Sequence, residues 1–318
     1  MKKMRFSRVF YTLPFRILRF LDRILLVRSL TYQQYERVHT SLSFPLVRLA
    51  FAAGTGYLPN LKNPSTFNEL LLSERLFNRS PLTPVLSDKL AVRDFVASKI
   101  DRKHLIPLYA CHPSYEALVS SDIPSNCVIK MNHSSGQLLI NRNGDDISRP
   151  IKKFKSWFVD KYRFQELMWF NQSIKRQAVI EELLLTKEGK VPADYKFFMF
   201  GGKLEFVQVD SNRFTGHTRT LFDKEWNCIN VKYLYPPGPE VDRPARLNLM
   251  ISIAEKLSED FPFMRVDLYD VEGDVYFGEL TSFPSAGYAE IQPFRYDKQW
   301  GRKLMGILQK RSRSSKNV

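Results

Sequence analysis

The sequence predicts an α+β protein, built as two lobes with a helical N-terminal extension. Antiparallel hairpins are expected at 127–140, 194–209 and 264–277, where strand-like apolar runs flank turns of small or acidic residues. Segments with helical spacing lie between and after them, at 246–259 and 296–308 among others. At 318 residues the chain is long enough to bury a large core and to divide into two or three lobes.

The N-terminal segment carries a concentrated positive charge. The chain has a formal net charge of +15, and residues 1–28 contain eight Lys and Arg residues against one acid, Asp22. Apolar residues lie between these bases at close to helical spacing, but no apolar run approaches the roughly 20 residues of a spanning helix. A small-residue signal cleavage site is also missing. Two interpretations stay open: a helix that binds an anionic membrane surface, and a helix that packs on the protein with a solvated basic face.

The cysteines indicate the compartment. Cys111, Cys127 and Cys228 are widely spaced and odd in number, so they form neither a disulfide framework nor a zinc pattern. A reducing cytoplasm is the simplest compartment for such a chain, with or without peripheral contact to the inner face of the membrane. The five histidines show no metal-ligand spacing. Because no nucleic-acid-binding module is recognisable, we expect no nucleic-acid partner despite the positive charge.

Helices are expected between the N-terminal segment and the first hairpin. Residues 33–53 have helical spacing. Thr66 and Glu69 have the spacing of a capping box at the start of the next helix. A further helix is expected from Ser87 onward, and Lys89 projects from its first turn either as a surface charge or as a phosphate contact.

Two other segments are basic. Residues 151–164 predict a helix whose aromatic face belongs to the core. The tail at 310–316 is rich in Lys, Arg and Ser, and we expect it to be disordered.

The hairpin at 127–140 has features of a phosphate site. An apolar strand carries one lysine, Lys130, and a turn of small polar residues follows it. Such a turn can close its backbone N–H groups over phosphates, while the lysine supplies a fixed positive charge. The signal is weak by itself, because an ordinary hairpin can contain a lysine and a glycine. The turn residues in question are His133, Ser134, Ser135 and Gly136.

The hairpin at 264–277 and the residues after it indicate a metal site. A turn at Gly273 brings Asp267 of the first strand close to Glu279 of the second. Two neighbouring carboxylates repel each other unless a cation lies between them, and hard oxygen ligands suit Mg²⁺. A solvated hairpin whose acids face water is the simpler alternative. Arg265 beside the first acid and Thr281 beyond the second favour the functional interpretation.

Further polar residues accompany the remaining strands. The apolar strand over 178–185 contains Glu181 and Glu182 and could equally be a plain core strand. Lys196 lies in an otherwise aromatic strand, and because an unpaired buried lysine is costly, we expect it to face a cleft that holds anions. A polar loop follows whose cations could bind a substrate carboxylate or phosphate, or form salt bridges at the rim. These loop residues are Arg213, His217 and Arg219.

Taken in order, these motifs resemble the TupA-like ATP-grasp family, which is associated with bacterial surface polysaccharides and teichuronopeptide. The resemblance extends from about Asn63 to Arg302. It is carried by Lys130 with Asn132-His133 and Gly136, by the strand with Glu181-Glu182, and by Arg265-Val-Asp267 and Glu279-Leu-Thr281 before Pro-Ser-x-Gly. The sequence departs from the family pattern at Ser134 and Gln137, where glycines are common, at Thr281, where asparagine is frequent, and at Ser285, where glycine is frequent.

The resemblance implies an ATP-grasp fold in which two α+β lobes clamp ATP, with Mg²⁺ as the second cofactor. The implied divisions are an N-terminal extension at 1–62, a helical region at 63–125, a small lobe at 126–185, a large lobe at 186–304 and a basic tail at 305–318. Nucleotide contacts are implied for Lys130, His133, Ser134, Ser135, Gly136, Glu181, Glu182, Leu183, Leu184 and Lys196. Metal ligands are implied at Asp267, Glu279 and Thr281, and catalytic roles for Arg265 and Lys196.

The function implied by the resemblance is an ATP-dependent carboxylate–amine ligase. It would form an amide through an acyl phosphate, on carboxylate and amine substrates that are linked to a glycan, and Arg265 would stabilise charge on the acyl oxygen. Two alternatives stay open. A glycosyltransferase could use the paired acids with Mg²⁺ and a nucleotide sugar, and a nucleotide-binding scaffold could use the same fold without turnover.

Overall fold

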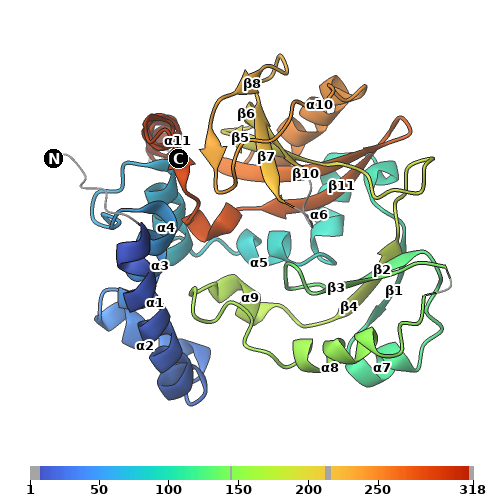
Figure 1. Cartoon of the computed structure of the whole chain (residues 1–318), viewed down its shortest axis with the longest axis horizontal. Helices are drawn as coiled ribbons and strands as arrows, with labels where there is room; N and C mark the ends of the chain where they lie inside the picture. Colours follow the sequence, from blue (N-terminus) through green and yellow to red (C-terminus); the bar gives the residue numbers. More distant parts are fainter. Residues whose placement is uncertain (1–7, 144, 212–215, 315–318) are drawn as a thin grey trace.

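The computed structural model describes residues 8–143, 145–211 and 216–314, and it contains two main β-sheets surrounded by helices (Figure 1). The smaller sheet has the order β1-β4-β2-β3, and all of its neighbouring pairs are antiparallel. The hairpin of β2 and β3, at one edge of this sheet, is the one that the sequence predicts over 127–140. The strands are β1 (Leu108–His112), β2 (Cys127–Met131), β3 (Leu138–Asn141) and β4 (Ala178–Glu182).

The larger sheet has the order β11-β10-β5-β6-β7-β8 and is also antiparallel throughout. The predicted hairpins at 194–209 and 264–277 form its centre and one edge. Gly201 and Gly202 both have positive φ in the turn of the first, as a tight hairpin requires. The strands are β5 (Asp194–Phe200), β6 (Lys203–Ser211), β7 (Thr218–Phe222), β8 (Cys228–Ile229), β10 (Phe263–Val271) and β11 (Asp274–Thr281), and a separate pair joins β9 (Lys232–Tyr233) to β12 (Ile291–Gln292).

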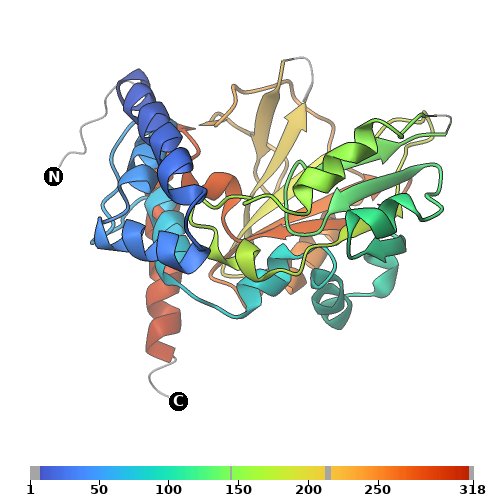
Figure 2. The same ribbon diagram turned by 90° about the horizontal axis from the view of Figure 1, so that it is seen from below.

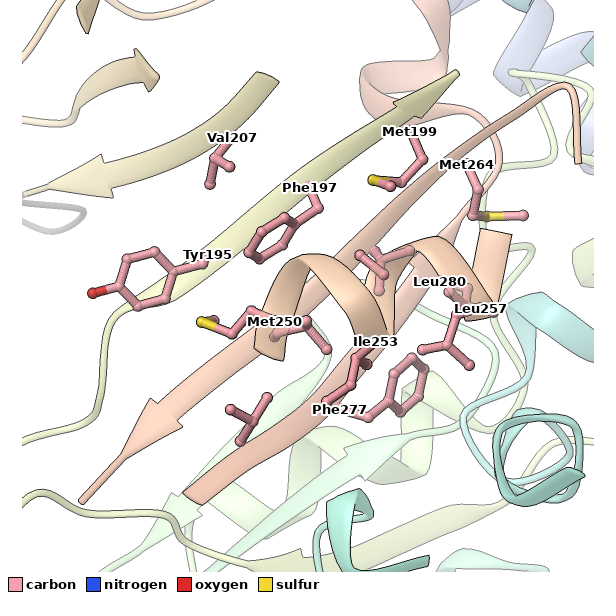
Figure 3. Close-up of a cluster of buried hydrophobic side chains, with 14 of the residues drawn as sticks. Tyr195, Phe197, Met199, Val207, Met250, Ile253, Leu257, Met264, Phe277 and Leu280 are labelled. Atoms are coloured by element: carbon pink, nitrogen blue, oxygen red, sulfur yellow. The ribbon is translucent and has the colours of Figure 1, made fainter. Parts of the chain in front are cut away.

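Both faces of the larger sheet are covered by apolar side chains. Successive residues of a strand point to opposite faces, so along β5 Phe197 joins one core cluster and Phe198 the other. On the first face, α10 (Leu247–Ser258) packs against the sheet through Met250, Ile253 and Leu257 (Figure 3). On the second, α4 (Phe67–Phe77) and α11 (Arg295–Ser314) contribute the other cluster. Burial on both sides explains why this strand is almost wholly aromatic.

The N-terminal extension is a helical layer at one end of the molecule, beside α4 (Figures 1 and 2). Its elements are α1 (Arg8–Asp22), the short π-helical turn η1 (Arg23–Val27), α2 (Tyr32–Ser41) and α3 (Pro45–Thr55). The segment expected to be helical over 33–53 forms two helices, α2 and α3, with a break between them. Ser43 and Phe44 have positive φ, which ends one helix, and Pro45 begins the next.

The extension is joined to the body by buried polar contacts as well as by a shared core. Asp22 is buried, and its carboxylate lies 2.7 Å from His39 Nε2 and accepts from the Tyr35 hydroxyl at 2.8 Å. Gln165 donates to the same carboxylate at 2.9 Å, which ties α1 to the middle of the chain. Tyr35 packs with Phe164 in one apolar cluster. Residues 8–62 are therefore part of the folded body.

The remaining helices are short, and their positions correct several expectations. The capping box at Thr66 is confirmed, because its Oγ1 accepts from Glu69 N at 3.2 Å while Glu69 accepts from Thr66 N at 3.1 Å. The helix expected over 151–164 ends at Trp157. These short elements are α5 (Leu82–Ser87), α6 (Val92–Lys99), η2 (Arg102–His104), α7 (Tyr115–Val119), η3 (Pro150–Lys152), α8 (Lys153–Trp157), α9 (Trp169–Ser173) and η4 (Pro284–Gly287).

Two expected boundaries also differ. The region 63–125 is not a separate unit, since β1 belongs to the smaller sheet while Leu86, Val92 and Val96 pack in the core beneath the larger one. The basic tail is not wholly irregular, because α11 continues as far as Ser314.

Candidate active site

A cleft of about 510 Å³ lies between the two sheets and collects most of the residues that the sequence singles out. The smaller sheet contributes Val128 and Lys130, and the larger sheet contributes Lys196, Asp267 and Glu279. The connection between the lobes closes one side with apolar and acidic residues. These are Glu181, Glu182, Leu183, Leu184, Val191 and Pro192. The cleft is thus polar on the side of the larger sheet and mixed elsewhere, as a site for a nucleotide requires.

The predicted acidic pair forms as expected. Asp267 and Glu279 are directly opposite each other in the antiparallel pairing of β10 and β11. The register shifts beside this pair, where Gly278 is the extra residue of β11. A Cβ on Gly278 would lie 3.1 Å from the Asp267 carbonyl oxygen, so glycine permits the close approach at this bulge. The bulge directs Glu279 into the cleft beside Asp267.

Cations of the protein itself surround the two carboxylates. Arg265 Nε donates to Asp267 Oδ1 at 2.7 Å and its NH2 donates to Asp267 Oδ2 at 2.8 Å, and the same NH2 reaches Glu279. Lys196 lies opposite Asp267 on β5 and donates to Asp267 Oδ2 at 2.6 Å and to Asp194. Lys196 lines the cleft, but its partners there are carboxylates of the protein, and its contact with a bound anion stays a prediction. The cation that lies between the acids here is an arginine.

Burial and these neighbouring charges act in opposite directions on the two acids. Burial raises the pKa of the Asp267 carboxyl, although Arg265 and Lys196 oppose this. Burial also acts to raise the pKa of Glu279, but the attraction of Arg265, Lys196 and Lys89 outweighs it and lowers that pKa to about 2. Glu279 is therefore fully ionised at neutral pH and can act as an anionic ligand.

The acidic pair fits Mg²⁺ shared with phosphates better than a metal held by protein alone. In the described part of the chain, no three His, Cys, Asp or Glu side chains are grouped so as to hold a metal ion. Mg²⁺ commonly takes one or two carboxylates and completes its octahedron with water and phosphate oxygens, so two carboxylate donors suffice. Thr281 Oγ1 donates to Glu279 Oε1 at 3.1 Å, which orients the carboxylate. The metal assignments of Asp267, Glu279 and Thr281 stay predictions.

Lys130 and Glu181 form an ion pair inside the cleft. Lys130 reaches Glu181 Oε2, and Arg93 NH1 lies 3.3 Å from Glu181 Oε1. Glu181 is 4% exposed, so its charge depends on these two partners. The expected nucleotide contact of Glu181 would therefore come from its backbone. Val128 and Lys130 lie on the strand next to it and face the same cleft.

Lys89 is a cation without a carboxylate partner among the described residues. Its ammonium donates to the Ser134 carbonyl, and burial, helped by repulsion from Lys130, lowers its pKa to about 8. A neighbouring anion would reverse this effect, because an opposite charge favours the protonated lysine. Of the two interpretations of Lys89 that the sequence leaves open, the position in the cleft favours the phosphate contact.

The predicted phosphate loop is held by a tyrosine that the sequence did not single out. Tyr162 Oη accepts from Ser135 N at 2.8 Å and donates to Ser135 O at 3.2 Å. His133 is buried against the same ring, at 5.6 Å between ring centroids, and Gly136 has a φ of 82°. The loop residues His133, Ser134, Ser135 and Gly136 therefore lie at the edge of the cleft, and their contact with a nucleotide stays a prediction.

The three residues proposed for substrate contact lie in different situations. Arg213 is outside the described residues. His217 lines the cleft, stacks on Tyr235 at 3.7 Å and lies 3.2 Å from Asp210. Arg219 is 7% exposed and donates to both oxygens of Asp210, at 2.6 and 3.1 Å. The geometry gives Arg219 a structural partner and leaves His217 as the residue that faces the cleft.

A second pocket, of about 160 Å³, adjoins the cleft. Both cavities are lined by Lys89, Ser135, Arg265 and Glu279, so they meet at these four residues. The second pocket is otherwise lined by hydroxyl, aromatic and basic side chains, among them Tyr162 and Arg163. Sequence reasoning missed these residues, because nothing local distinguishes them from other members of a basic segment. We call this second cavity the reaction pocket.

Comparison with known proteins then identifies the family. A model of the TupA-like ATP-grasp family matches residues 69–305. The chain belongs to this family. Membership confirms the predicted two-lobed ATP-grasp fold and the expectation of an ATP-grasp ligase. None of the curated proteins matches the chain by sequence.

The structure is also similar to those of several ATP-grasp ligases. D-alanine–D-alanine ligase from Bacillus anthracis is 14% identical with a TM-score of 0.42, over 72% of this chain and 70% of that one. L-amino acid ligase from Bacillus licheniformis is 12% identical with a TM-score of 0.43, over 79% and 55%. An N5-carboxyaminoimidazole ribonucleotide synthetase in complex with ADP is 9% identical with a TM-score of 0.39, and this chain covers 45% of its length. Such likenesses carry no information on substrates.

Proposed function

We propose that this ATP-grasp protein activates a substrate carboxylate with ATP and joins it to an amine. The observation that carries the proposal is the meeting of the two cavities at Lys89, Arg265 and Glu279. The larger cavity accommodates a nucleotide, and the smaller one accommodates the carboxylate that its terminal phosphate must reach. A transfer between two bound substrates requires such adjacent sites.

In the nucleotide cleft, the base lies against the connection between the lobes and the phosphates lie among the lysines. Backbone groups over 181–184 meet the adenine, while Lys130 and Lys89 bind phosphate oxygens. Mg²⁺ held by Asp267 and Glu279 would neutralise charge on those oxygens. Lys196 and Arg265 hold the two carboxylates in position through the contacts described above.

The reaction in this proposal has two steps. A carboxylate oxygen of the substrate attacks the γ-phosphorus of ATP, the bond to the β–γ bridging oxygen breaks, and ADP leaves. The amine then attacks the carbonyl carbon of the acyl phosphate, the amide forms, and phosphate and a proton are released. Arg265 lies where the two cavities meet, so it stabilises the negative charge that develops on the acyl oxygen.

The substrates that we propose are components of a bacterial surface polysaccharide or of its precursor, in a cytoplasmic reaction. Support comes from the family, whose name connects it with such polymers, and from the basic surroundings of the reaction pocket. Lys89, Arg163 and Arg265 line it against a single acid, Glu279. An acidic sugar, for example one that carries a uronic-acid carboxyl group, suits this charge.

The same proposal includes contact with the inner face of the membrane through α1. In the described part of the chain, no helix has the length and hydropathy to cross a bilayer. Instead α1 packs on α3 through one side, with Tyr11 buried, and exposes an apolar stripe on the other. Arg16, Arg19 and Arg23 are exposed beside the stripe. An exposed apolar face bordered by arginines suits the interface of an anionic bilayer. The stripe consists of Val9, Phe10, Leu13, Ile17, Phe20, Leu21, Ile24 and Leu25, each between 40% and 77% exposed.

Trapping of the acyl phosphate tests the reaction. The protein is incubated with ATP, Mg²⁺, candidate uronic acids and hydroxylamine in place of the amine, and hydroxamate and ADP are measured together. Equal amounts of hydroxamate and ADP, dependent on the acid, would support the ligase. Binding of a nucleotide sugar without any binding of ATP would instead favour glycosyl transfer. ATP binding without ADP release with any acid would favour a scaffold.

A further inference from the structure

A wide basic groove lies between the N-terminal helices and the segment over 158–168. Its volume is about 750 Å³, which is larger than that of the nucleotide cleft. One wall is formed by α1 and η1 and the other by residues around Lys161 and Phe164. The cations that line this groove are Arg19, Arg23, Arg28, Lys161 and Arg163. We call this cavity the basic groove.

Most of these cations have no carboxylate partner among the described residues. The groove contains two acids, and both already have cationic neighbours: Glu166 lies 3.7 Å from Arg19, and Asp160 lies 3.6 Å from Arg176. Lys161 donates to the carbonyls of Val27 and Leu30. Arg23 and Arg28 are exposed, and neither forms a salt bridge with any acid of the described residues. The groove therefore has an excess of positive charge at short range.

Arg163 occupies a special position in the groove. Its φ is 50°, in the left-handed region that non-glycine residues rarely adopt. Its Nε donates to the Tyr162 hydroxyl at 3.1 Å, and the same hydroxyl holds Ser135. The strained backbone thus fixes a guanidinium beside the phosphate loop. Strain of this kind is frequent at ligand-binding positions.

The basic groove adjoins the reaction pocket. Ser135, Tyr162 and Arg163 line both cavities. The reaction pocket in turn meets the nucleotide cleft at Lys89 and Glu279. The three cavities therefore lie next to one another, from α1 and η1, past Arg163, to the point where the phosphoryl group would be transferred.

We propose that the basic groove is a substrate-binding site for an acidic oligosaccharide, one whose successive sugars carry carboxylate or phosphate groups. Its terminal carboxyl group lies in the reaction pocket, while Arg163, Lys161, Arg23 and Arg28 bind the charges that follow. This inference rests on the proposed ligase reaction and assigns the site that selects its substrate. Several separated cations in one groove recognise repeated charges better than one isolated carboxylate.

The walls of the groove favour a sugar chain over an acidic peptide. Peptides in extended conformation commonly pair with the free edge of a β-sheet. The residues that line this groove belong to α1, to η1 with Arg28 after it, to the loop over 158–168 and, at Ser135, to the turn between β2 and β3, so none lies on a strand. Tyr162 adds aromatic surface between the cations, which suits the apolar faces of sugar rings.

Binding experiments with defined probes test the proposal. Titration calorimetry would compare tetragalacturonate, which carries four carboxylates, with galacturonate, with tetra-L-glutamate and with inorganic phosphate. The variant is Arg23→Glu/Arg28→Glu, and its control is Lys62→Glu/Arg102→Glu, which changes the net charge equally at exposed positions outside the three cavities. We expect tetragalacturonate to bind more tightly than galacturonate. The groove variant should weaken tetragalacturonate binding by about tenfold or more, while the control should change it by less than about twofold.

Each other outcome would overturn the proposal. An equal loss of tetragalacturonate affinity in the groove variant and in the control would mean that the effect comes from net charge in general. Equal affinity for tetragalacturonate and galacturonate would mean that one anion fills the site. Tighter binding of tetra-L-glutamate would indicate a peptide substrate. If the groove variant lost only its affinity for phosphatidylglycerol vesicles, the groove would be a lipid headgroup site. ATP affinity is measured separately, so a failed groove and a failed ligase assignment remain distinguishable.

Discussion

Glu279 lies directly opposite Asp267 across β10 and β11, and the guanidinium of Arg265 donates to both carboxylates. Two neighbouring acids that share one arginine have excess negative charge unless further cations are close. Lys196 supplies one of them, at 2.6 Å from Asp267. The arrangement leaves Glu279 the more exposed acid, with 35% of its side chain accessible, and therefore the one better placed to meet a metal ion that arrives with phosphates.

Substitutions at Lys130 and Glu181 should separate the effect on ATP affinity from the effect on the free energy of unfolding. In Lys130→Met the buried Glu181 keeps only Arg93 as a partner, so the free energy of unfolding should fall by about 1–3 kcal/mol. ATP affinity should fall as well, because a phosphate contact is lost. In the double variant Lys130→Met/Glu181→Gln the stability should return while the ATP affinity stays low. Denaturant unfolding and calorimetry measure the two effects. If the double variant recovered both its stability and its ATP affinity, Lys130 would not bind the nucleotide.

Lys89 should lower stability at neutral pH in the absence of ligand. Burial lowers the pKa of Lys89 to about 8 in the folded state from its ordinary value of 10.5, so the unfolded chain holds this proton more tightly. The resulting destabilisation is complete below pH 8 and disappears as the pH rises from 8 to 10.5. Lys89→Met should therefore raise the free energy of unfolding at pH 7 by about 1 kcal/mol and have no such effect near pH 10.5. A variant less stable than wild type at pH 7 would contradict this account.

The buried carboxylate of Asp22 should stabilise the N-terminal helices above pH 4. Burial alone would raise its pKa, but hydrogen bonds from His39, Gln165 and Tyr35 outweigh burial and hold the pKa below 3.8. Because the folded pKa is the lower one, the stabilisation is present above about pH 4 and is lost as the pH falls through the folded value. Asp22→Asn should lower the melting temperature at pH 6, and the difference from wild type should narrow below pH 4. A difference that is constant across this range would mean that the charge of Asp22 is unimportant.

The apolar stripe on α1 should bind anionic vesicles. Phe10, Leu13 and Phe20 are 66%, 65% and 63% exposed. Burial of each such side chain in the lipid interface contributes about 1.5–3 kcal/mol, so replacement of all three by serine should weaken co-sedimentation with phosphatidylglycerol vesicles by about 100-fold or more. Point substitutions are preferable to deletion of residues 1–28, because Asp22 is part of the buried contacts with Tyr35 and Gln165.

The matched control for the stripe replaces three exposed apolar residues elsewhere. Leu58, Tyr109 and Leu249 are between 41% and 47% exposed and lie outside α1. Their replacement by serine should leave vesicle binding unchanged. Equal loss in both triple variants, or no loss in the α1 variant, would refute membrane contact through this helix.

The sequence predicts those features that depend on neighbours along the chain. The hairpin turn at Gly273 places Asp267 opposite Glu279, and the capping box at Thr66 begins α4, because turn and cap chemistry are local. The break between α2 and α3 was missed, because Ser43 and Phe44 adopt positive φ within the fold, where Phe44 joins a buried cluster. The local sequence pattern carries no information on this tertiary contact.

The site was predictable in part for the same reason. Lys130 and Lys196 were found because each is a lone charge in an apolar strand. Arg163 and Tyr162 were missed, because the sequence predicts a helix over 151–164. The helix ends at Trp157, and both residues lie in the loop that follows it. Their importance arises from contacts with the loop at Ser135 and from the groove against α1, which join distant parts of the chain.

The ATP affinity of Glu279→Gln in the presence and absence of Mg²⁺ tests the central claim most directly. The substitution keeps the shape of the side chain and removes one negative charge, and Glu272→Gln at the exposed turn of the same hairpin is the control. By titration calorimetry, wild type and the control should bind ATP at least about tenfold more tightly with Mg²⁺ than without, a difference of about 1.4 kcal/mol. Glu279→Gln should lose most of that difference while its melting temperature stays close to that of wild type. Binding of ATP with Mg²⁺ by Glu279→Gln as tightly as by wild type would contradict a metal site at this hairpin.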